Sequence, residues 1–169
     1  MEGIIIKNQS NDYTVRTKKG INICKPRGKF RLDNITPLVG DIVDIDDINN
    51  YILEIKPRKN SLIRPQIANV DIAIIVTSVK EPDFDSNLLD KLLTIISYNN
   101  ITPVICLTKL DLLNAEELNK VKEISSYYQK IGYNVVTNND IKEIKKIIEN
   151  KIIVFAGQSG AGKSSLLNK

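Results

Sequence analysis

The sequence predicts two units, an all-β unit over residues 1–65 and an α/β unit over residues 66–169. Up to about residue 59, short runs rich in Ile, Val and Tyr alternate with turn residues, whereas longer segments at strand and helix spacing follow. The excess of positive charge belongs to residues 1–65, which hold twelve Lys and Arg against eight Asp and Glu. A glycine-rich pattern typical of a phosphate-binding loop lies near residue 160.

The composition excludes several classes of protein. The chain of 169 residues is 42% hydrophobic, which is enough for a packed core, but it has no run of 18 apolar residues that could cross a membrane. The N-terminal residues 1–7 do not resemble a signal peptide, so we expect a cytoplasmic protein with no membrane partner. With only Cys24 and Cys106 and no histidine, the sequence offers neither a disulfide framework nor a zinc site, and two buried free thiols are expected.

The first unit is expected to be a five-stranded barrel of the OB type. Five brief apolar runs are separated by the turn-forming stretches Ser-Asn-Asp, Lys-Lys-Gly, Pro-Arg-Gly and Val-Gly-Asp, at the spacing of a small barrel or sandwich. OB barrels often bind oligonucleotides. The expected strands cover residues 3–7, 13–17, 21–25, 41–46 and 51–56.

Basic residues in the expected loops of this barrel suggest RNA binding by neutralisation of phosphates. Tyr13 and Phe30 could stack on bases among them. A solvated basic surface explains the same residues, and the sequence leaves both interpretations open. The basic residues are Lys18, Lys19, Lys25, Arg27, Lys29, Arg31, Lys56, Arg58, Lys59 and Arg64.

In the second unit, strands alternate with helices, which predicts a parallel, doubly wound sheet. The segment 68–78 contains a continuous apolar run, as in a strand that is covered on both faces. The expected strands cover residues 68–78, 102–109, 133–138 and 151–156, and the expected helices 85–100, 115–131, 140–150 and 164–169.

The segment 157–164 matches the pattern G-x-x-x-x-G-K-[ST] of a phosphate-binding loop, or P-loop. It follows an apolar β-branched strand and precedes a helix, which is the setting in which backbone N–H groups can surround phosphates. Lys163 would reach the β- and γ-phosphates and is the expected catalytic residue, while the Ser164 hydroxyl would bind Mg²⁺. The alternative is a plain Gly/Ser turn between a strand and a helix.

The tetrapeptide 108–111, Thr-Lys-Leu-Asp, ends another strand of the same sheet. Asp111 could accept hydrogen bonds from N1–H and N2–H₂ of guanine, while the Lys109 stem lies along the base. Adenine offers no such donor pair, and an unpaired carboxylate makes the wrong base costly. Alternatively, the tetrapeptide is a helix cap with a solvated charge.

The base-reading tetrapeptide precedes the P-loop, which inverts the usual order in guanine-nucleotide proteins. This order, the basic β unit and the sequences of residues 57–93 and 157–169 are all similar to those of one family. The chain resembles the circularly permuted GTPases that act on the small ribosomal subunit (RsgA type). The resemblance implies an OB domain, a permuted GTPase domain, GTP or GDP with Mg²⁺, and the small (30S) subunit and its rRNA as partners in late maturation. The implied nucleotide-binding residues are Thr108, Lys109, Leu110, Asp111, Gly157, Gln158, Ser159, Gly160, Ala161, Gly162, Lys163, Ser164 and Ser165.

The sequence departs from the family pattern in three ways. Thr108 stands where Asn is usual, which removes an amide expected to tie the base motif to the P-loop, and Thr137-Asn138 replaces a Ser-Ala pair. The family's switch segments and zinc-binding domain would follow residue 169, so the chain reads as a fragment of a protein that is expected to be monomeric. We expect weak nucleotide binding with impaired hydrolysis, and an exposed apolar edge strand at 152–155.

Two other functions fit parts of the sequence. A different P-loop NTPase, an ATPase or a small-molecule kinase, would need only residues 157–164, with residues 108–111 incidental. A non-catalytic RNA-binding module would need only the basic barrel.

Overall fold

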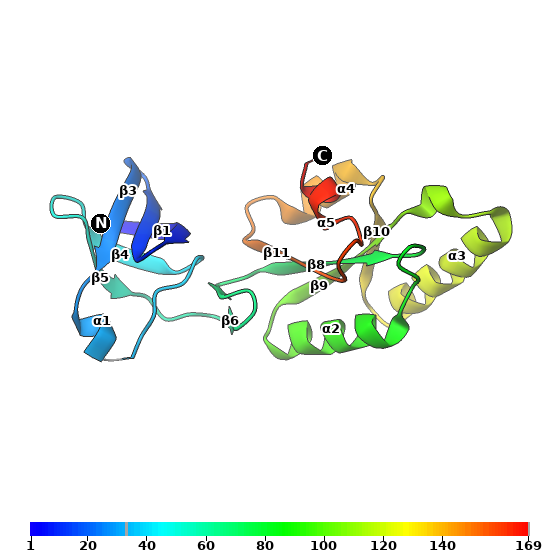
Figure 1. The fold of residues 1–169 in the computed structure, drawn as a ribbon, viewed down its shortest axis with the longest axis horizontal. Coiled ribbons are helices and arrows are strands. Elements are labelled where there is room, and N and C mark those ends of the chain that lie inside the picture. Colours follow the sequence, from blue (N-terminus) through cyan, green and yellow to red (C-terminus); the bar gives the residue numbers. More distant parts are fainter. Residues whose placement is uncertain (33, 169) are drawn as a thin grey trace. The chain divides into compact units, whose positions relative to one another are not determined.

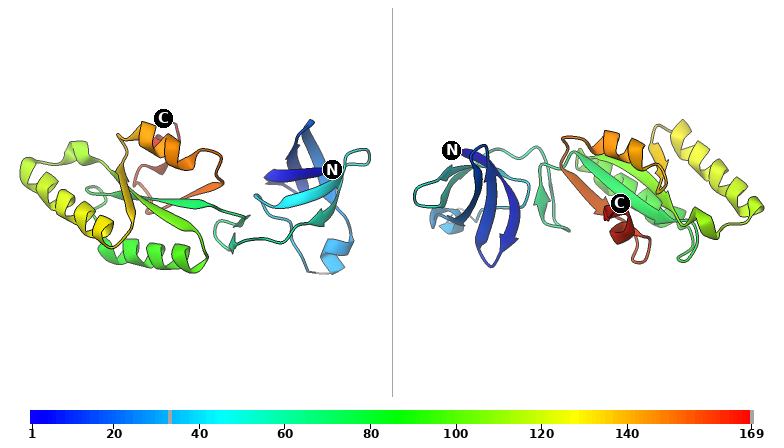
Figure 2. Two further views of the ribbon diagram at one scale, coloured as in Figure 1. Left: turned by 180° about the vertical axis from the view of Figure 1, so that it is seen from behind. Right: turned by 90° about the horizontal axis from the view of Figure 1, so that it is seen from above.

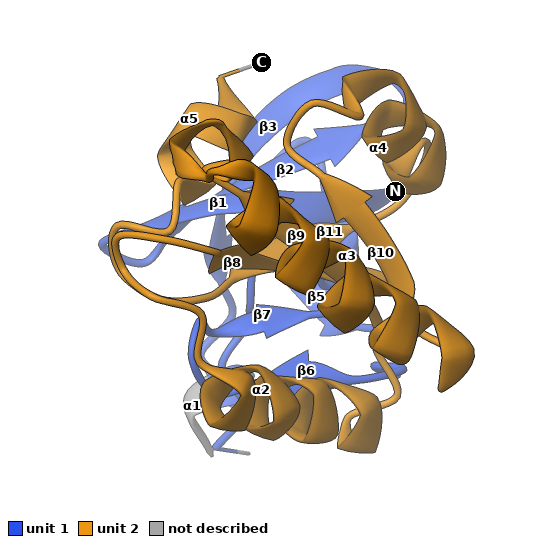
Figure 3. Ribbon diagram, turned by 90° about the vertical axis from the view of Figure 1, so that its right-hand side faces the viewer, with its two compact units in different colours: residues 1–70 blue, residues 71–169 orange. Residues whose placement is uncertain are grey.

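The computed structural model describes residues 1–32 and 34–168, and Figure 1 shows the order of its elements. The chain divides into two compact units, Met1–Val70 and Asp71–Lys169 (Figure 3). No helix of the described residues is long and apolar enough to span a membrane.

The first unit is built on a closed five-stranded barrel, which confirms the expected OB-like fold. Its strands follow the order β1-β2-β3-β5-β4 around the barrel. Neighbouring strands are antiparallel except for β3 and β5, which run parallel. The strands are β1 (Glu2–Gln9), β2 (Asp12–Thr17), β3 (Gly20–Pro26), β4 (Ile42–Asp46) and β5 (Tyr51–Ile55).

Alternate residues of these strands fill the barrel, as the period of two requires. The expectation that Tyr13 and Phe30 stack on RNA bases is wrong, because only 2% and 5% of their surfaces are exposed. Phe30 lies on the short helix α1 (Lys29–Leu32), which the sequence pattern did not predict. The barrel core consists of Ile5, Tyr13, Val15, Cys24, Phe30, Val43, Ile45 and Ile52.

A two-stranded hairpin, β6 (Ser61–Leu62) and β7 (Ile67–Ala68), follows the barrel. The strand expected over 68–78 therefore begins only at Ile72, because Ala68 pairs with Ser61 and Asn69 has a φ of +57°. The buried Asn69 side chain donates to the Gly40 carbonyl at 2.9 Å and accepts from the Lys59 amide at 2.9 Å. Asn69 thus ends the hairpin by bonding to backbone of the first unit.

The second unit is a four-stranded parallel sheet in the order β10-β9-β8-β11, with helices on both faces (Figures 1 and 2). Side-chain caps fix the helix starts, since Asp85 accepts from the Leu88 amide and Asn114 forms a capping box with Glu117. The elements are β8 (Ile72–Ser78), α2 (Ser86–Tyr98), β9 (Thr102–Thr108), the 3-10 turn η1 (Leu110–Leu112), α3 (Ala115–Lys130), β10 (Asn134–Thr137), α4 (Ile141–Ile148), β11 (Ile153–Ala156) and α5 (Lys163–Leu167). Lys169, which the sequence placed in the last helix, lies outside the described residues.

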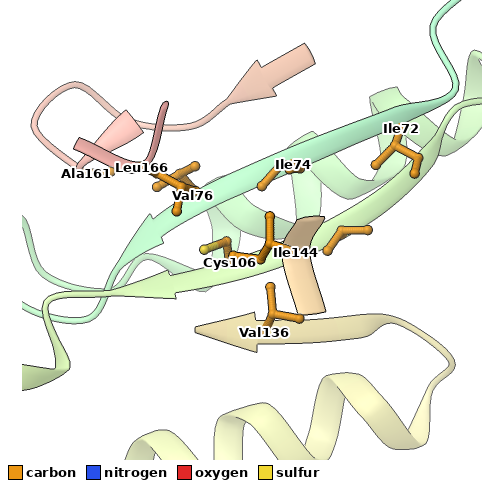
Figure 4. Close-up of a cluster of buried hydrophobic side chains, with 9 residues drawn as sticks. Ile72, Ile74, Val76, Cys106, Val136, Ile144, Ala161 and Leu166 are labelled. Atoms are coloured by element: carbon orange, nitrogen blue, oxygen red, sulfur yellow. The ribbon is translucent and has the colours of Figure 1, made fainter. Parts of the chain in front are cut away.

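The core on one face of this sheet joins the strands to α4 and α5 (Figure 4). Ile74 and Val76 of β8 and Cys106 of β9 lie beside Ile144 of α4 and Leu166 of α5. Strand β11 lies at the end of the sheet and pairs with β8 alone among the described strands, as expected for the edge. Its side chains are more buried than expected, because Val154 is 8% exposed and its neighbours in the strand are partly covered.

Candidate functional site

The four parallel strands of the second unit all end on the same side of the sheet, so their carboxyl ends lie together. The P-loop follows β11, and the base-reading tetrapeptide begins with the last residue of β9. In open α/β sheets, ligands bind at this edge. The topology therefore brings together two motifs that are far apart in the chain.

Three glycines of the P-loop have a φ that L side chains rarely adopt: +129° at Gly157, +76° at Gly160 and +96° at Gly162. The first is also the most crowded, because a Cβ at Gly157 would lie 2.1 Å from the Val76 carbonyl oxygen. The loop can thus pass close against β8 only with glycine at this position. Gly162 immediately precedes α5, so it sets the direction of the helix that begins at Lys163.

The Lys163 ammonium curls back over the loop. It donates hydrogen bonds to the carbonyl oxygens of Gly157 at 2.8 Å and Gln158 at 2.6 Å. Ser164 and Ser165 follow on the first turn of α5, and their side chains are exposed. This arrangement holds a cation at the loop, and the two acceptors that it contacts are neutral carbonyl oxygens rather than carboxylates of the described residues.

The base-reading tetrapeptide turns sharply after β9. Lys109 adopts a left-handed conformation with φ +63°, and its ammonium donates to the Glu81 carbonyl oxygen. Leu110 and Asp111 belong to the 3-10 turn, where the Asp111 side chain is exposed. The carboxylate is therefore accessible to a ligand at this end of the sheet.

Both motifs line one pocket of about 160 Å³. Thr108, Lys109 and Asp111 contribute to it from the tetrapeptide 108–111, and Gly162 and Ser165 from the P-loop and α5. The lining also includes Asn138 and Leu166. The other predicted residues belong to the same two loops but not to this lining: Leu110, Gly157, Gln158, Ser159, Gly160, Ala161, Lys163 and Ser164.

A buried hydrogen bond ties the two motifs together. The Thr108 hydroxyl, on a residue that is 2% exposed, donates to the Ala161 carbonyl oxygen at 2.6 Å. The expectation that Thr in place of Asn removes the tie to the P-loop is thus wrong, because a hydroxyl at this position reaches the loop directly. Ala161 is itself fully buried, so the bond is shielded from water.

Asn138 is a pocket residue that the sequence analysis left out of its site. Asn138 directly follows β10, and its backbone amide donates to the Leu107 carbonyl of β9 at 3.0 Å. Asp140 holds this turn by accepting from the hydroxyl of Thr137 at 2.7 Å and its amide at 2.9 Å, and these bonds lower the pKa of Asp140. The position of Asn138 directly after the third parallel strand was the signal that could have identified it.

The possible metal ligands at this site suit Mg²⁺ that is bound together with phosphates. Ser164 offers one exposed hydroxyl, and among the described residues no three His, Cys, Asp or Glu side chains gather as a metal site. Mg²⁺ usually keeps several waters and takes one or two protein ligands beside phosphate oxygens. A single hydroxyl next to a phosphate-binding loop is consistent with that preference.

The basic residues of the first unit are partly used within the barrel. Arg58 makes a bidentate pair with the fully buried Asp41, at 2.7 and 2.8 Å, and also donates to the Thr36 carbonyl at 2.7 Å. Lys56 pairs with Asp44 at 2.5 Å. The expectation that Arg58 is available to phosphates is therefore wrong, whereas Lys18, Lys25, Arg27 and Lys29 are exposed.

Comparison with known proteins identifies both units. The family profile for the RsgA GTPase matches residues 55–169, and the profile for the RsgA N-terminal domain matches residues 2–52. The small ribosomal subunit biogenesis GTPase RsgA of Caldanaerobacter subterraneus subsp. tengcongensis is 46% identical over 99% of this chain and 59% of its own length. The small ribosomal subunit biogenesis GTPase RsgA 2 of Oceanobacillus iheyensis is 49% identical over 99% of this chain and 60% of its own.

Two solved structures share the fold. YjeQ from Thermotoga maritima has a TM-score of 0.89 at 37% identity, and YloQ, described as a circularly permuted GTPase, has a TM-score of 0.87 at 42% identity. The match covers 99% of this chain and 63% of each of those chains. The chain thus spans less than two thirds of the length of these relatives, and its tetrapeptide 108–111 precedes the P-loop. It belongs to the RsgA GTPase family.

Proposed function

We propose that this chain binds guanine nucleotide at the edge of its sheet and forms part of a GTPase that assists late maturation of the small ribosomal subunit. The observation that carries the proposal is the shared pocket, to which Asp111 contributes from one motif and Gly162 and Ser165 from the other. The names of the relatives, small ribosomal subunit biogenesis GTPases, support the choice of partner. A cytoplasmic location and a monomeric whole protein are part of the same proposal.

Each residue has a distinct part in binding. Asp111 accepts from N1–H and N2–H₂ of guanine, and the Lys109 stem lies along the base. Lys163 exchanges its bonds with the Gly157 and Gln158 carbonyls for phosphate oxygens, which as charge-assisted acceptors are the stronger partners. The backbone amides of 157–165 surround the phosphates, and Ser164 binds the Mg²⁺ that accompanies them.

Hydrolysis is assigned to the whole protein, and binding to this part of it. Only one hydroxyl, that of Ser164, is assigned to Mg²⁺, and among the described residues no three His, Cys, Asp or Glu side chains gather as a metal site; both support the expectation that this chain alone turns GTP over slowly. Zinc, if the whole protein holds it, would require ligands outside this sequence, which contains no histidine and two cysteines.

Binding of RNA by the barrel is the second part of the proposal. The exposed basic residues Lys18, Lys25, Arg27 and Lys29 support contact with phosphates, whereas the buried Tyr13 and Phe30 cannot stack on bases. Affinity for RNA should then fall steeply with salt and show little preference for base sequence.

The test of guanine binding uses labelled GDP against ADP and the variant Asp111→Asn. The wild type should prefer GDP, whereas Asp111→Asn should prefer xanthosine diphosphate, since its O2 needs a donor where guanine offers one. Loss of the paired carboxylate should weaken GDP binding about 10- to 100-fold, equivalent to about 1.5–3 kcal/mol for a bond to a charged group. Equal affinity of the wild type for GDP and ADP would overturn guanine recognition in favour of a different P-loop NTPase.

A further inference from the structure

The segment between β8 and α2 makes reciprocal contacts with the base-reading motif. The Lys109 ammonium donates to the Glu81 carbonyl oxygen. In the opposite direction, the Lys80 ammonium donates to the Leu112 carbonyl oxygen at 3.3 Å and to both carboxylate oxygens of Glu117, at 2.9 and 3.1 Å. Neighbouring residues of one loop thus hold the base-reading segment at its start and at its end.

Glu117 joins this contact to the start of α3. Its carboxylate also accepts from the Asn114 amide at 2.8 Å, as part of the capping box that begins the helix. The Asn114 amide, and then Lys80, lower the pKa of Glu117, so the carboxylate stays charged at neutral pH. Lys80 therefore bonds to the end of the 3-10 turn and to the helix that follows it.

The backbone that carries Lys80 is itself fixed. The buried Ser78 hydroxyl donates to the Lys80 carbonyl at 2.6 Å and accepts from the Lys80 amide at 3.3 Å. Pro82 lies next to the P-loop, since a Cβ at Gly160 would be 3.8 Å from its Cδ. The backbone of this loop is therefore fixed, so the Lys80 side chain can hold the residues that it contacts in place.

The turn that carries Asp111 has few bonds of its own. The Leu112 amide bonds to the Lys109 carbonyl and the Leu113 amide to the Leu110 carbonyl, both at 3.2 Å. Such a single turn, exposed to solvent, visits other conformations unless outside contacts hold it. Only the fraction of molecules with Asp111 in place can read guanine, and the apparent affinity falls in proportion to that fraction.

We infer that Lys80 is a positioning residue for guanine recognition, which holds the turn 110–112 so that Asp111 faces the base. The inference rests on the proposed function of this site. Lys80 does not contact the nucleotide in this role; it acts through the Leu112 carbonyl and Glu117.

The test compares Lys80→Met, which keeps the length of the side chain but removes its charge and donors, with the wild type. GDP affinity should fall about threefold to tenfold, while ADP affinity, which depends on the P-loop alone, should not change. The ratio of the two affinities is the decisive readout, because a general loss of stability would weaken both nucleotides equally. Lys80→Arg, which keeps the charge, should recover most of the ratio.

Lys120→Met is the matched control. Lys120 pairs with Glu116 at 3.0 Å on the same helix, without a described contact to the turn, so its loss should leave the ratio unchanged. An unchanged ratio in Lys80→Met, or an equal loss for GDP and ADP, would overturn the positioning role while leaving the proposed function intact. A wild type without preference for GDP would overturn the proposed function, and the positioning role with it.

Discussion

Basic side chains have different uses in the two units of the chain. In the barrel, Arg58 is bound bidentately to a fully buried carboxylate, so its charge belongs to the interior. At the carboxyl ends of the parallel strands, Lys163 donates to two carbonyl oxygens of the P-loop. The first cation stabilises a fold, and the second has neutral partners that a phosphate can replace.

The difference shows what sequence patterns can and cannot predict about charge. The basic residues of the barrel were recognised from the composition of its expected loops. Composition does not reveal which acidic partners the fold brings to a given cation. The P-loop was recognised by a spacing of residues between a strand and a helix, so the pattern contained its own structural context. A charged residue is therefore best interpreted together with the element that carries it.

The largest expected effect is on the stability of the barrel, in which Arg58 has a structural role that Lys163 lacks. Arg58→Ala would leave Asp41 charged and buried without its partner, which should lower the free energy of unfolding of the barrel by about 3–5 kcal/mol. Hydrogen exchange of the amides in β4 and β5 measures the loss. Lys18→Ala, at an exposed position, is the control and should change little. A stable Arg58→Ala barrel that has lost affinity for RNA would reverse this assignment.

The next effect concerns binding rather than stability. Lys163→Ala should weaken GDP binding about 10- to 100-fold, because bonds between an ammonium and phosphate contribute about 1.5–3 kcal/mol. The same variant should unfold much like the wild type, since only two carbonyls of an open loop lose a donor. Isothermal titration with GDP, beside Lys151→Ala at the other end of β11, measures the effect. Equal losses in both variants would argue against a specific role for Lys163.

The smallest effect tests the bond between the two motifs. Thr108→Val keeps the shape of the side chain but leaves the buried Ala161 carbonyl without its donor, which should cost about 1–2 kcal/mol. Thermal unfolding and GDP titration should both report the loss, because the bond joins the phosphate-binding and base-reading loops. Thr108→Ser retains the hydroxyl and should behave nearly as the wild type. A Val variant with unchanged unfolding and binding would show that the bond contributes nothing.

Most of the fold followed from local patterns. The five barrel strands and the four parallel strands were predicted because alternation and β-branched runs are local properties. The start of β8 was misplaced because the apolar residues of 68–76 suggest one strand, while a left-handed Asn69 and a short hairpin divide the segment. The role of Phe30 was missed because only the closed barrel decides that an aromatic residue beside lysines lies inside.

The site was predicted in its motifs but not in the contacts that hold them. Spacing identified residues 108–111 and 157–165, and the order of parallel strands predicted that they meet. The tie to the P-loop was expected to go with the missing Asn amide, but the Thr108 hydroxyl makes a bond to the loop, because side-chain reach depends on a distance that spacing does not contain. Lys80 was missed for the same reason, since its partner Glu117 lies on another element.

Because β11 lies at the border of the sheet, a bound nucleotide should also affect how copies of the chain associate. One side of its backbone ladder has no partner among the described strands, and such a border favours association between copies of a chain. The P-loop is the direct continuation of this strand, so a nucleotide that orders the loop also stabilises the strand against local opening. Guanine nucleotide in the buffer should therefore keep concentrated solutions of the protein clear for longer.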